Sequence, residues 1–188
     1  MNRTNVISNR REAYYYDRVR EAGPRYESFD VLSTELALNF LHTYDLFLQI
    51  LGRSMSEYGL SKSTLNILML LRHGPAEGMQ LRDLGELLFV SRANITGLMN
   101  HLEEKGYVKR VVDAQDRRAR YARITRKAEA LLDEFVPIHY RRIRALLRDL
   151  SGEEKQALLL LLLKVRKSIN AHASERDTKE SIAYPTIE

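Results

Sequence analysis

The chain of 188 residues contains no cysteine and no tryptophan, and only four prolines. Without cysteine it can have no disulfide framework, no thiolate zinc site and no thiol-based redox sensing. No apolar run reaches the roughly 18 residues that a membrane-spanning helix needs, the longest being ALLLLLL at 157–163. The first residues, MNRTNVISNRR, also lack the apolar core of a signal peptide. We therefore expect a cytoplasmic protein that is not associated with a membrane.

The signatures of an enzyme are missing as well. The sequence has no glycine-rich phosphate loop, no GxSxG motif and no cysteine nucleophile. Glu103 and Glu104 fit a helix surface better than a catalytic carboxylate pair. The histidines show neither an HExxH motif nor close paired spacing; they are His42, His73, His101, His139 and His172. We expect no enzymatic activity, no cofactor and no metal site.

What the chain does contain is one strongly basic segment. The whole protein carries a net charge of +5, with 44% hydrophobic and 29% charged residues, which is typical of a globular protein. The window 105–127 holds nine basic and two acidic residues, a net +7, so the rest of the chain carries −2. Because the positive charge is confined to one segment, it indicates a surface that faces a polyanion.

The hydrophobic periodicity predicts a mainly α-helical fold. Helices are expected over about 30–58, 61–73, 81–88, 91–105, 125–150 and 151–173, with short strands at 107–112 and 120–124. We divide the chain into an N-terminal arm (1–28), a helical layer (29–60 and 125–173), a central domain of short helices and two strands (61–124) and a C-terminal tail (174–188). The arm is expected to be partly ordered at best, or helical where it packs on a partner.

Two short helices joined by a tight turn form a helix-turn-helix, in which the second helix enters the DNA major groove. In the second helix, Ile95, Leu98, Met99 and Leu102 form the inner face. Arg, Asn and Thr side chains can pair with base edges, and Ser91 with the first backbone N–H groups can hold a phosphate. For this helix alone, an ordinary polar surface is the stronger interpretation. The predicted DNA contacts on the helix are Ser91, Arg92, Asn94, Thr96 and Asn100.

The two strands and the stretch DAQDRR between them form a two-stranded wing beside that helix. An arginine at the tip of a wing can enter the narrow minor groove. Asp116 lies two residues before Arg118, close enough to hold its guanidinium in a bidentate salt bridge and direct it. A solvated loop would not need this spacing. We therefore predict a wing contact at Arg118, directed by Asp116.

Together, LGELLFVSRANITGLMNHLEEKGYVKR, DAQDRRARYARIT and the flanking helices resemble the MarR family of winged-helix transcription regulators, over roughly residues 30–172. The resemblance implies a homodimer whose dimerisation layer (29–60 and 125–173) comes from the first helix and the two C-terminal helices, and it makes 61–124 the winged helix-turn-helix DNA-binding domain. It also implies a sequence-specific regulator, usually a repressor, that binds a pseudo-palindromic double-stranded DNA operator. The recognition-helix contacts that it implies are Arg92, Asn94, Thr96 and Asn100, with Arg117 and Arg118 in the wing supported by Asp116.

Many members of that family bind small aromatic or phenolic anions. The resemblance therefore also implies a small-molecule effector that relieves repression. Its binding residues are unknown: His42, Tyr44 and Arg72 could contribute, but ordinary structural roles are the stronger interpretation for each. Two alternatives stay open, an architectural DNA-binding module without a ligand and a winged helix used for protein–protein contact. They differ from a regulator in whether duplex DNA is bound and whether its sequence matters.

Some positions depart from the family's pattern. Phe89 stands where the turn usually carries glycine, and we expect it to pack against the domain rather than to be exposed. Gln80 stands where a capping threonine is common, Gly85 replaces a small alanine, and Arg120 replaces an apolar strand residue. The geometry of the turn is therefore less certain than the positions that face the groove.

Overall fold

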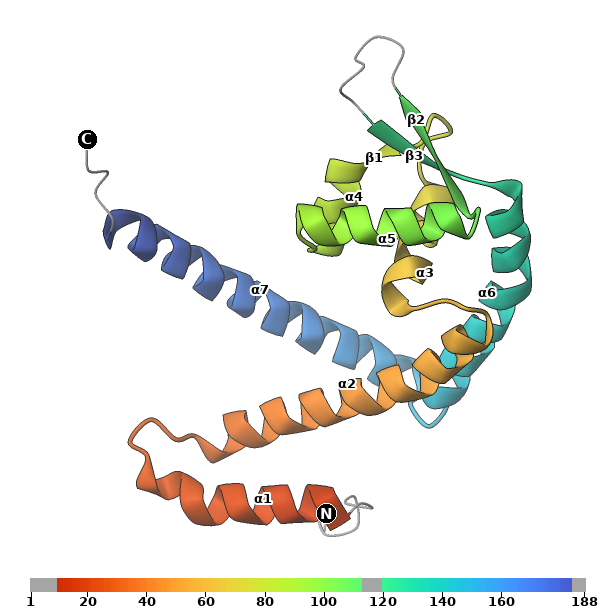
Figure 1. The fold of residues 1–188 in the computed structure, drawn as a ribbon. Coiled ribbons are helices and arrows are strands. Elements are labelled where there is room, and N and C mark those ends of the chain that lie inside the picture. The colour runs from red at the N-terminus through yellow and green to blue at the C-terminus, as the bar shows by residue number, and fades with distance from the viewer. Residues whose placement is uncertain (1–9, 113–119, 184–188) are drawn as a thin grey trace. The chain divides into compact units, whose positions relative to one another are not determined.

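The computed structural model describes residues 10–112 and 120–183, and the side chains of 14–111 and 121–173. It forms two compact units, 1–139 and 140–188, which are described separately (Figure 1). The predicted mainly helical fold with a winged helix-turn-helix is confirmed. The helices are α1 (Arg10–Ala22), α2 (Val31–Glu57), α3 (Lys62–His73), α4 (Leu81–Leu88), α5 (Arg92–Glu104), α6 (Arg126–Leu146) and α7 (Gly152–Ala183), and a 3-10 turn, η2, spans Gly23–Arg25.

Side chains that the sequence marks as caps begin several of these helices. Asp30 accepts a hydrogen bond from the Ser33 backbone N–H at the start of α2. Hydrogen bonding by the Ser33 side chain, and then by its backbone, lowers the pKa of the Asp30 carboxyl. Ser61 and Thr64 cap α3 reciprocally. The predicted capping box of Ser151 and Glu154 is confirmed at the start of α7. These caps explain why the helix starts could be placed from the sequence.

The wing belongs to a three-stranded antiparallel sheet rather than to an isolated ribbon. Strand β3 (Arg120–Ile124) lies in the centre, between β2 (Val108–Val112) and the short β1 (Met79–Gln80). Met79 pairs with Ala122 and Gln80 with Tyr121, and the Gln80 amide also donates a hydrogen bond to the Tyr121 hydroxyl. Strand β1 was not predicted, because two residues are too few to show an alternation of apolar and polar side chains. It leads directly into α4.

The core of the first unit lies beneath the helix-turn-helix. Ile67 and Leu68 of α3, Leu84 of α4, and Met99 and Leu102 of α5 are almost completely buried. On α6, Leu132 and Phe135 are buried too. Their burial fixes which side of α5 faces inward and leaves the opposite side exposed.

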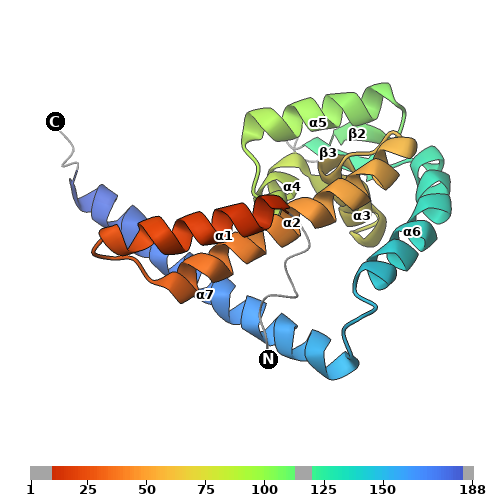
Figure 2. The ribbon, with the colours of Figure 1, turned by 90° about the horizontal axis from the view of Figure 1, so that it is seen from below.

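Within the predicted N-terminal arm, the described residues form helix α1, which packs on α2 of the same chain, followed by the turn η2. Figures 1 and 2 both show α1 lying along α2. Tyr16 of α1 is buried, with its ring 6.5 Å from that of His42, and Arg20 forms an ion pair with Glu35 at 2.5 Å. Gly23 lies against the Phe29 ring where a Cβ atom could not fit. The sequence did not predict this packing, because the helix is polar overall and its contacts with α2 come from a few side chains, such as Tyr16 and Arg20.

The end of α4 corrects a second expectation. Phe89 does not pack against the domain: its side chain is 96% exposed, and its backbone is left-handed, with φ 52°. The Phe89 N–H bonds the Glu86 carbonyl and the Val90 N–H bonds the Gly85 carbonyl, the pattern of a Schellman motif. This helix end turns residue 89 outward, so the ring has no core to enter.

The second unit contains the end of α6 and the long helix α7. Its leucines at 158–161 and 163 are exposed, and no described side chain from 140 to 173 is buried. Helix α7 extends to Ala183, beyond the predicted end near Ala173. In the described part of the chain, no helix combines the length and the apolar character that crossing a membrane requires.

Candidate nucleic-acid interface

Helix α5 presents a polar face at its N-terminal end. The Ser91 hydroxyl accepts a hydrogen bond from the Asn94 N–H at 3.3 Å, so Ser91 is the N-cap that the sequence predicts. Ile95, Met99 and Leu102 are buried, while Ser91, Arg92, Asn94, Thr96 and Asn100 are all exposed. Because four backbone N–H groups at a helix start lack partners within the helix, this end attracts an anion such as a phosphate.

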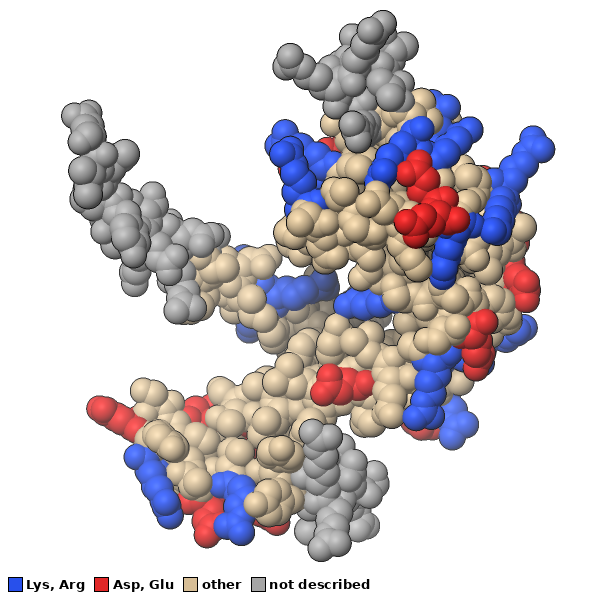
Figure 3. All heavy atoms as spheres, viewed as in Figure 1, with Lys and Arg blue, Asp and Glu red and all other residues tan. Residues whose placement is uncertain are grey.

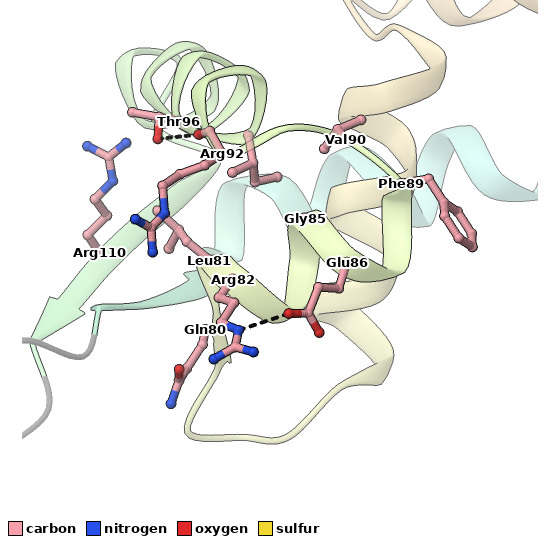
Figure 4. Close-up of a pocket in the computed structure, with 11 residues that line it drawn as sticks. Gln80, Leu81, Arg82, Gly85, Glu86, Phe89, Val90, Arg92, Thr96 and Arg110 are labelled. Carbon is pink, nitrogen blue, oxygen red and sulfur yellow. Dashed lines mark hydrogen bonds and ion pairs between the residues drawn. The ribbon is translucent and has the colours of Figure 1, made fainter. Parts of the chain in front are cut away.

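A groove of about 900 Å³ lies beside this end of α5 (Figure 4). Arg92 of α5, Arg82 of α4 and Arg110 of β2 surround it, whereas the Phe89 ring points away from the other side chains. A hydrogen bond to Glu86 at 2.8 Å raises the pKa of Arg82. The groove is lined by Gln80, Leu81, Arg82, Gly85, Glu86, Phe89, Val90, Arg92, Ile95, Thr96 and Arg110. It combines apolar walls with three cationic side chains.

Two of the predicted base contacts already have partners within the chain. The Thr96 hydroxyl donates to the Arg92 carbonyl at 2.8 Å, which leaves the Thr96 methyl group for an outside contact. The Asn100 side-chain oxygen accepts a hydrogen bond from Arg110 at 2.5 Å. Arg92, by contrast, forms no ion pair among the residues that the structure describes. Arg92 therefore offers a guanidinium to an incoming ligand without first breaking an ion pair.

Much of the basic segment also serves the fold. Lys105 donates to the Gly59 carbonyl at 2.9 Å, and Lys127 donates to the Lys105 carbonyl at 2.7 Å. The Arg123 guanidinium donates to the Glu77 carbonyl at 2.5 Å. These groups stay positively charged, and Figure 3 shows Lys and Arg side chains spread over the part of the molecule that carries α5, with acidic side chains between them. The surface therefore keeps its positive charge, although Lys105, Arg123 and Lys127 donate hydrogen bonds to carbonyl groups of the chain.

The predicted wing contacts Asp116, Arg117 and Arg118 lie outside the described residues, as does the rest of 113–119. The described strands β2 and β3 end on either side of this segment. The wing contacts therefore stay a prediction.

The three residues considered for an effector have separate partners. The Tyr44 hydroxyl accepts a hydrogen bond from Lys62 at 2.8 Å, and Arg72 forms an ion pair with Asp133 at 2.5 Å. His42 lies edge-on to the rings of Tyr15 and Tyr16. Among the described residues, no hydrogen bond, ion pair or ring contact joins the three into one site. A second hollow of about 440 Å³ lies between α3 and α5, lined by Gly59, Leu60, Ser61, Thr64, Ala93, Asn94, Gly97, Leu98 and His101.

Arg110 is the residue of this surface that sequence reasoning did not single out. Its guanidinium forms an ion pair with Glu103 at 3.0 Å, and its backbone N–H also bonds that carboxylate. The alternation of side chains along β2 could have indicated its position, because Arg110 shares a face of the strand with Val108, which is buried. Over 10–112 and 120–183, no group of three or more His, Asp or Glu side chains is placed to hold a metal ion.

Helices α4 and α5 with the β2–β3 ribbon define a winged helix-turn-helix, a class of fold in which the second helix enters the DNA major groove. Solved structures share this fold. The Streptomyces coelicolor MarR family regulator Sco3205, in complex with DNA, aligns with a TM-score of 0.70 at 19% identity, covering 76% of this chain and 91% of that one. The S. aureus MepR–DNA complex aligns with a TM-score of 0.63 at 22% identity, covering 72% and 95%.

Sequence comparison gives the family. The MarR family model matches residues 58–119. The HTH-type transcriptional repressor YetL of Bacillus subtilis (strain 168) is 29% identical over 147 residues, 78% of this chain and 88% of the relative. The uncharacterized HTH-type transcriptional regulator YkoM of the same organism is 30% identical over 142 residues, 73% and 90%. The chain belongs to the MarR family and is a transcriptional regulator rather than an enzyme.

Proposed function

We propose that this regulator acts as a homodimer that binds a pseudo-palindromic operator and represses transcription from the cytoplasm. In this proposal, Arg92, Asn94, Thr96 and Asn100 of α5 enter the major groove, and Ser91 holds a phosphate at the start of the helix. Asp116 supports Arg117 and Arg118 in the minor groove. The observation that carries the proposal is the exposed N-terminal end of α5, where Arg92 has no ion pair among the described residues beside a cationic groove.

Repression is supported by the name of one relative, the repressor YetL. DNA as the ligand is supported by two structures with the same fold, those of MepR and Sco3205, which were solved in complex with DNA. For the mechanism, a repressor needs only to occupy an operator that overlaps the binding site of the transcription machinery. The operator would therefore be expected near the start of a regulated gene.

A second copy of the chain is supported by the apolar side chains that α2 and α7 leave exposed. They include Leu32, Leu36, Phe40 and Leu41 on α2, and Leu159, Leu160 and Leu161 on α7. Covering such faces is worth roughly 25 cal/mol per Å² of apolar surface. A dimer of this kind would carry its recognition helices about 34 Å apart, so that they enter successive major grooves on one side of the duplex.

The test is a selection of bound duplexes from a random library, followed by affinity measurements on the best operator. We expect a pseudo-palindrome, and we expect Arg92→Ala to weaken binding to it by about 1–3 kcal/mol. The matched control is Arg53→Ala, which removes the same charge from an exposed position of α2. Equal affinities of the Arg92→Ala and Arg53→Ala variants for the operator would contradict the proposal.

The same selection separates the two alternative functions. An architectural module would bind duplexes of any sequence equally, because phosphate contacts carry no sequence information. A protein-interaction module would bind no duplex, even at low salt, where electrostatic binding is strongest. Only a sequence-specific regulator yields an enriched motif with two half-sites.

We further propose that a small aromatic carboxylate or similar anion relieves repression. A ligand can change the affinity for DNA only if it binds the DNA-competent and the incompetent conformation unequally. A coupling of about 1–3 kcal/mol would lower operator affinity some 5- to 150-fold. Because this coupling is reciprocal, calorimetry should show the ligand binding more weakly, by the same factor, when operator is present. Equal ligand affinity with and without operator would exclude the mechanism.

A further inference from the structure

The Asn100 amide is held in one orientation by Arg110, and this fixes what it can recognise. A guanidinium has five N–H donors and no acceptor, so the Asn100 atom within 2.5 Å of Arg110 must be the side-chain oxygen. The chemistry of the pair therefore settles which end of the amide faces β2. The NH₂ group lies at the other end of the planar amide, and no hydrogen bond is recorded for it among the described residues.

Arg110 is itself anchored. Its guanidinium forms the ion pair with Glu103 at 3.0 Å, and its backbone N–H donates to the other oxygen of the same carboxylate at 3.3 Å. Strand pairing holds the backbone of Arg110 opposite Ala122, which is completely buried. The Arg110 side chain is 24% exposed, and Glu103 compensates its charge at short range. A phosphate would have to break this ion pair to draw Arg110 away from Asn100.

We propose that Arg110 is a positioning residue that makes Asn100 a donor-only reader of the major groove, an inference that rests on the proposed binding of α5 to DNA. An unrestrained asparagine recognises adenine with two bonds, its oxygen accepting from N6–H and its NH₂ donating to N7. Here Arg110 takes one of the two lone pairs of the oxygen and turns that end of the amide toward β2, so that in this proposal only the NH₂ end faces the base. Asn100 therefore favours guanine, with its acceptors O6 and N7, or thymine, with O4, over adenine, whose single acceptor N7 lies beside the N6–H₂ donor.

Asn100→Asp tests this with almost no change of shape. One carboxylate oxygen still accepts from Arg110, while the outward NH₂ is replaced by an acceptor. At one base pair in each half-site, the preference should change from guanine or thymine to a base that donates, cytosine through N4 or adenine through N6. The readout is the set of sequences that the full-length protein selects from a random duplex library. We expect a change of about tenfold in relative affinity at that pair.

Two further variants make the result specific. Asn66→Asp adds the same charge at an exposed position of α3, and it should lower affinity evenly without altering base preference. Arg110→Lys keeps a positive charge for Glu103 but removes the second guanidinium nitrogen that holds Asn100. It should broaden the preference at the same base pair and leave the other positions unchanged, which a purely structural role for Arg110 would not do.

The outcomes are distinct. If Asn100→Asp folds and selects the same operator as the wild type, the donor-only role is wrong. If circular dichroism shows that Asn100→Asp does not fold, Arg110→Lys decides, and an unchanged preference at that base pair in Arg110→Lys overturns the proposal. Likewise, a wild-type preference for adenine at the position that Asn100→Ala relaxes would show that both ends of the amide read the base. If the wild-type protein enriches no sequence at all, the proposed operator binding fails first, and that result is separate from the other two.

Discussion

Phe89 adopts a backbone conformation that two other helices of this unit reserve for glycine. Helices α2, α4 and α5 end with the same pair of backbone hydrogen bonds, and the left-handed residue is Gly59, Phe89 and Gly106 respectively. For a residue with a Cβ atom the left-handed region costs roughly 1–2 kcal/mol. At Phe89 no buried ring contact offsets that cost, because its side chain is 96% exposed.

We therefore expect Phe89→Gly to raise the free energy of unfolding by about 0.5–1 kcal/mol, since the greater freedom of glycine in the unfolded chain cancels part of the gain. Gly106→Ala is the reverse substitution at an equivalent helix end. It should lower the free energy of unfolding by about 1 kcal/mol, because it places a Cβ atom on a left-handed residue. Urea denaturation followed by circular dichroism measures both. A loss of stability in Phe89→Gly would mean that the ring contacts something within the folded protein.

His139 makes stability depend on pH. Burial lowers the pKa of His139 below its ordinary value of 6.5, and its ring stacks on Phe135 at 5.3 Å. The folded state therefore binds this proton less readily than the unfolded state. The contribution of neutral His139 to stability is fully present above about pH 6.5, and it decreases as pH falls toward the lowered pKa of the folded state. We expect the urea midpoint to fall between about pH 7.5 and 5.5, and to fall less in His139→Gln. Identical slopes for the two proteins would show that other groups cause the dependence.

At the scale of the element, the wing carries the sharpest untested prediction. Arg118→Ala should weaken operator binding by about 1–3 kcal/mol, and Asp116→Ala should cost somewhat less, because Arg118 would keep its charge but lose its orientation. Fluorescence anisotropy at moderate salt measures both affinities. Arg144→Ala, an exposed arginine of α6, is the control for loss of a positive charge. Binding by Arg118→Ala as tight as that of the wild type would make DAQDRR a solvated loop.

The elements with a strong local signal were predictable. Ser61, Ser91 and the pair Ser151–Glu154 mark helix starts through their own hydrogen bonds, and Gly106 marks a helix end through its backbone. Strand β1 was not predicted, because its two residues form a strand only through their pairing with β3. For helix α1 the sequence left two alternatives, a partly ordered arm or a helix on a partner. Its packing on α2 of the same chain was not predicted, because it depends on contacts such as that of Arg20 with Glu35. Contacts distant in sequence leave little trace in a local pattern.

The candidate site divides along the same line. The exposed face of α5 followed from helical periodicity, and Arg92 and Asn94 are exposed as expected. The sequence could not show that the Asn100 oxygen and the Thr96 hydroxyl would be bonded within the chain, because those contacts depend on side-chain conformation and on β2. The burial of Phe89 was predicted wrongly, since its exposure follows from the helix end rather than from its hydrophobicity.

For the whole molecule, we expect a dimer that depends on α7. Replacing both Leu159 and Leu162 with glutamate should abolish dimerisation and, with it, operator binding, because buried carboxylates without partners are strongly unfavourable in an apolar interface. Gln156→Glu is the control, since it adds a carboxylate at an exposed polar position of the same helix. Sedimentation equilibrium measures the mass of each protein. A stable, folded monomer of the unmodified chain at micromolar concentration would contradict this.

If α5 and the wing bind DNA as proposed, the shared central strand has a mechanical consequence for the choice of operator. Strand β3 pairs on one side with β2 and on the other with β1, and β1 continues without a linker into α4. The base of the wing and the helix-turn-helix are thereby joined through one sheet, so the distance between them cannot adjust to a DNA sequence with the wrong spacing. With one base pair inserted between the segment under α5 and the segment under the wing, a duplex would contact either α5 or the wing, but not both. It would be released faster than an operator with the correct spacing, although it contains every favourable base.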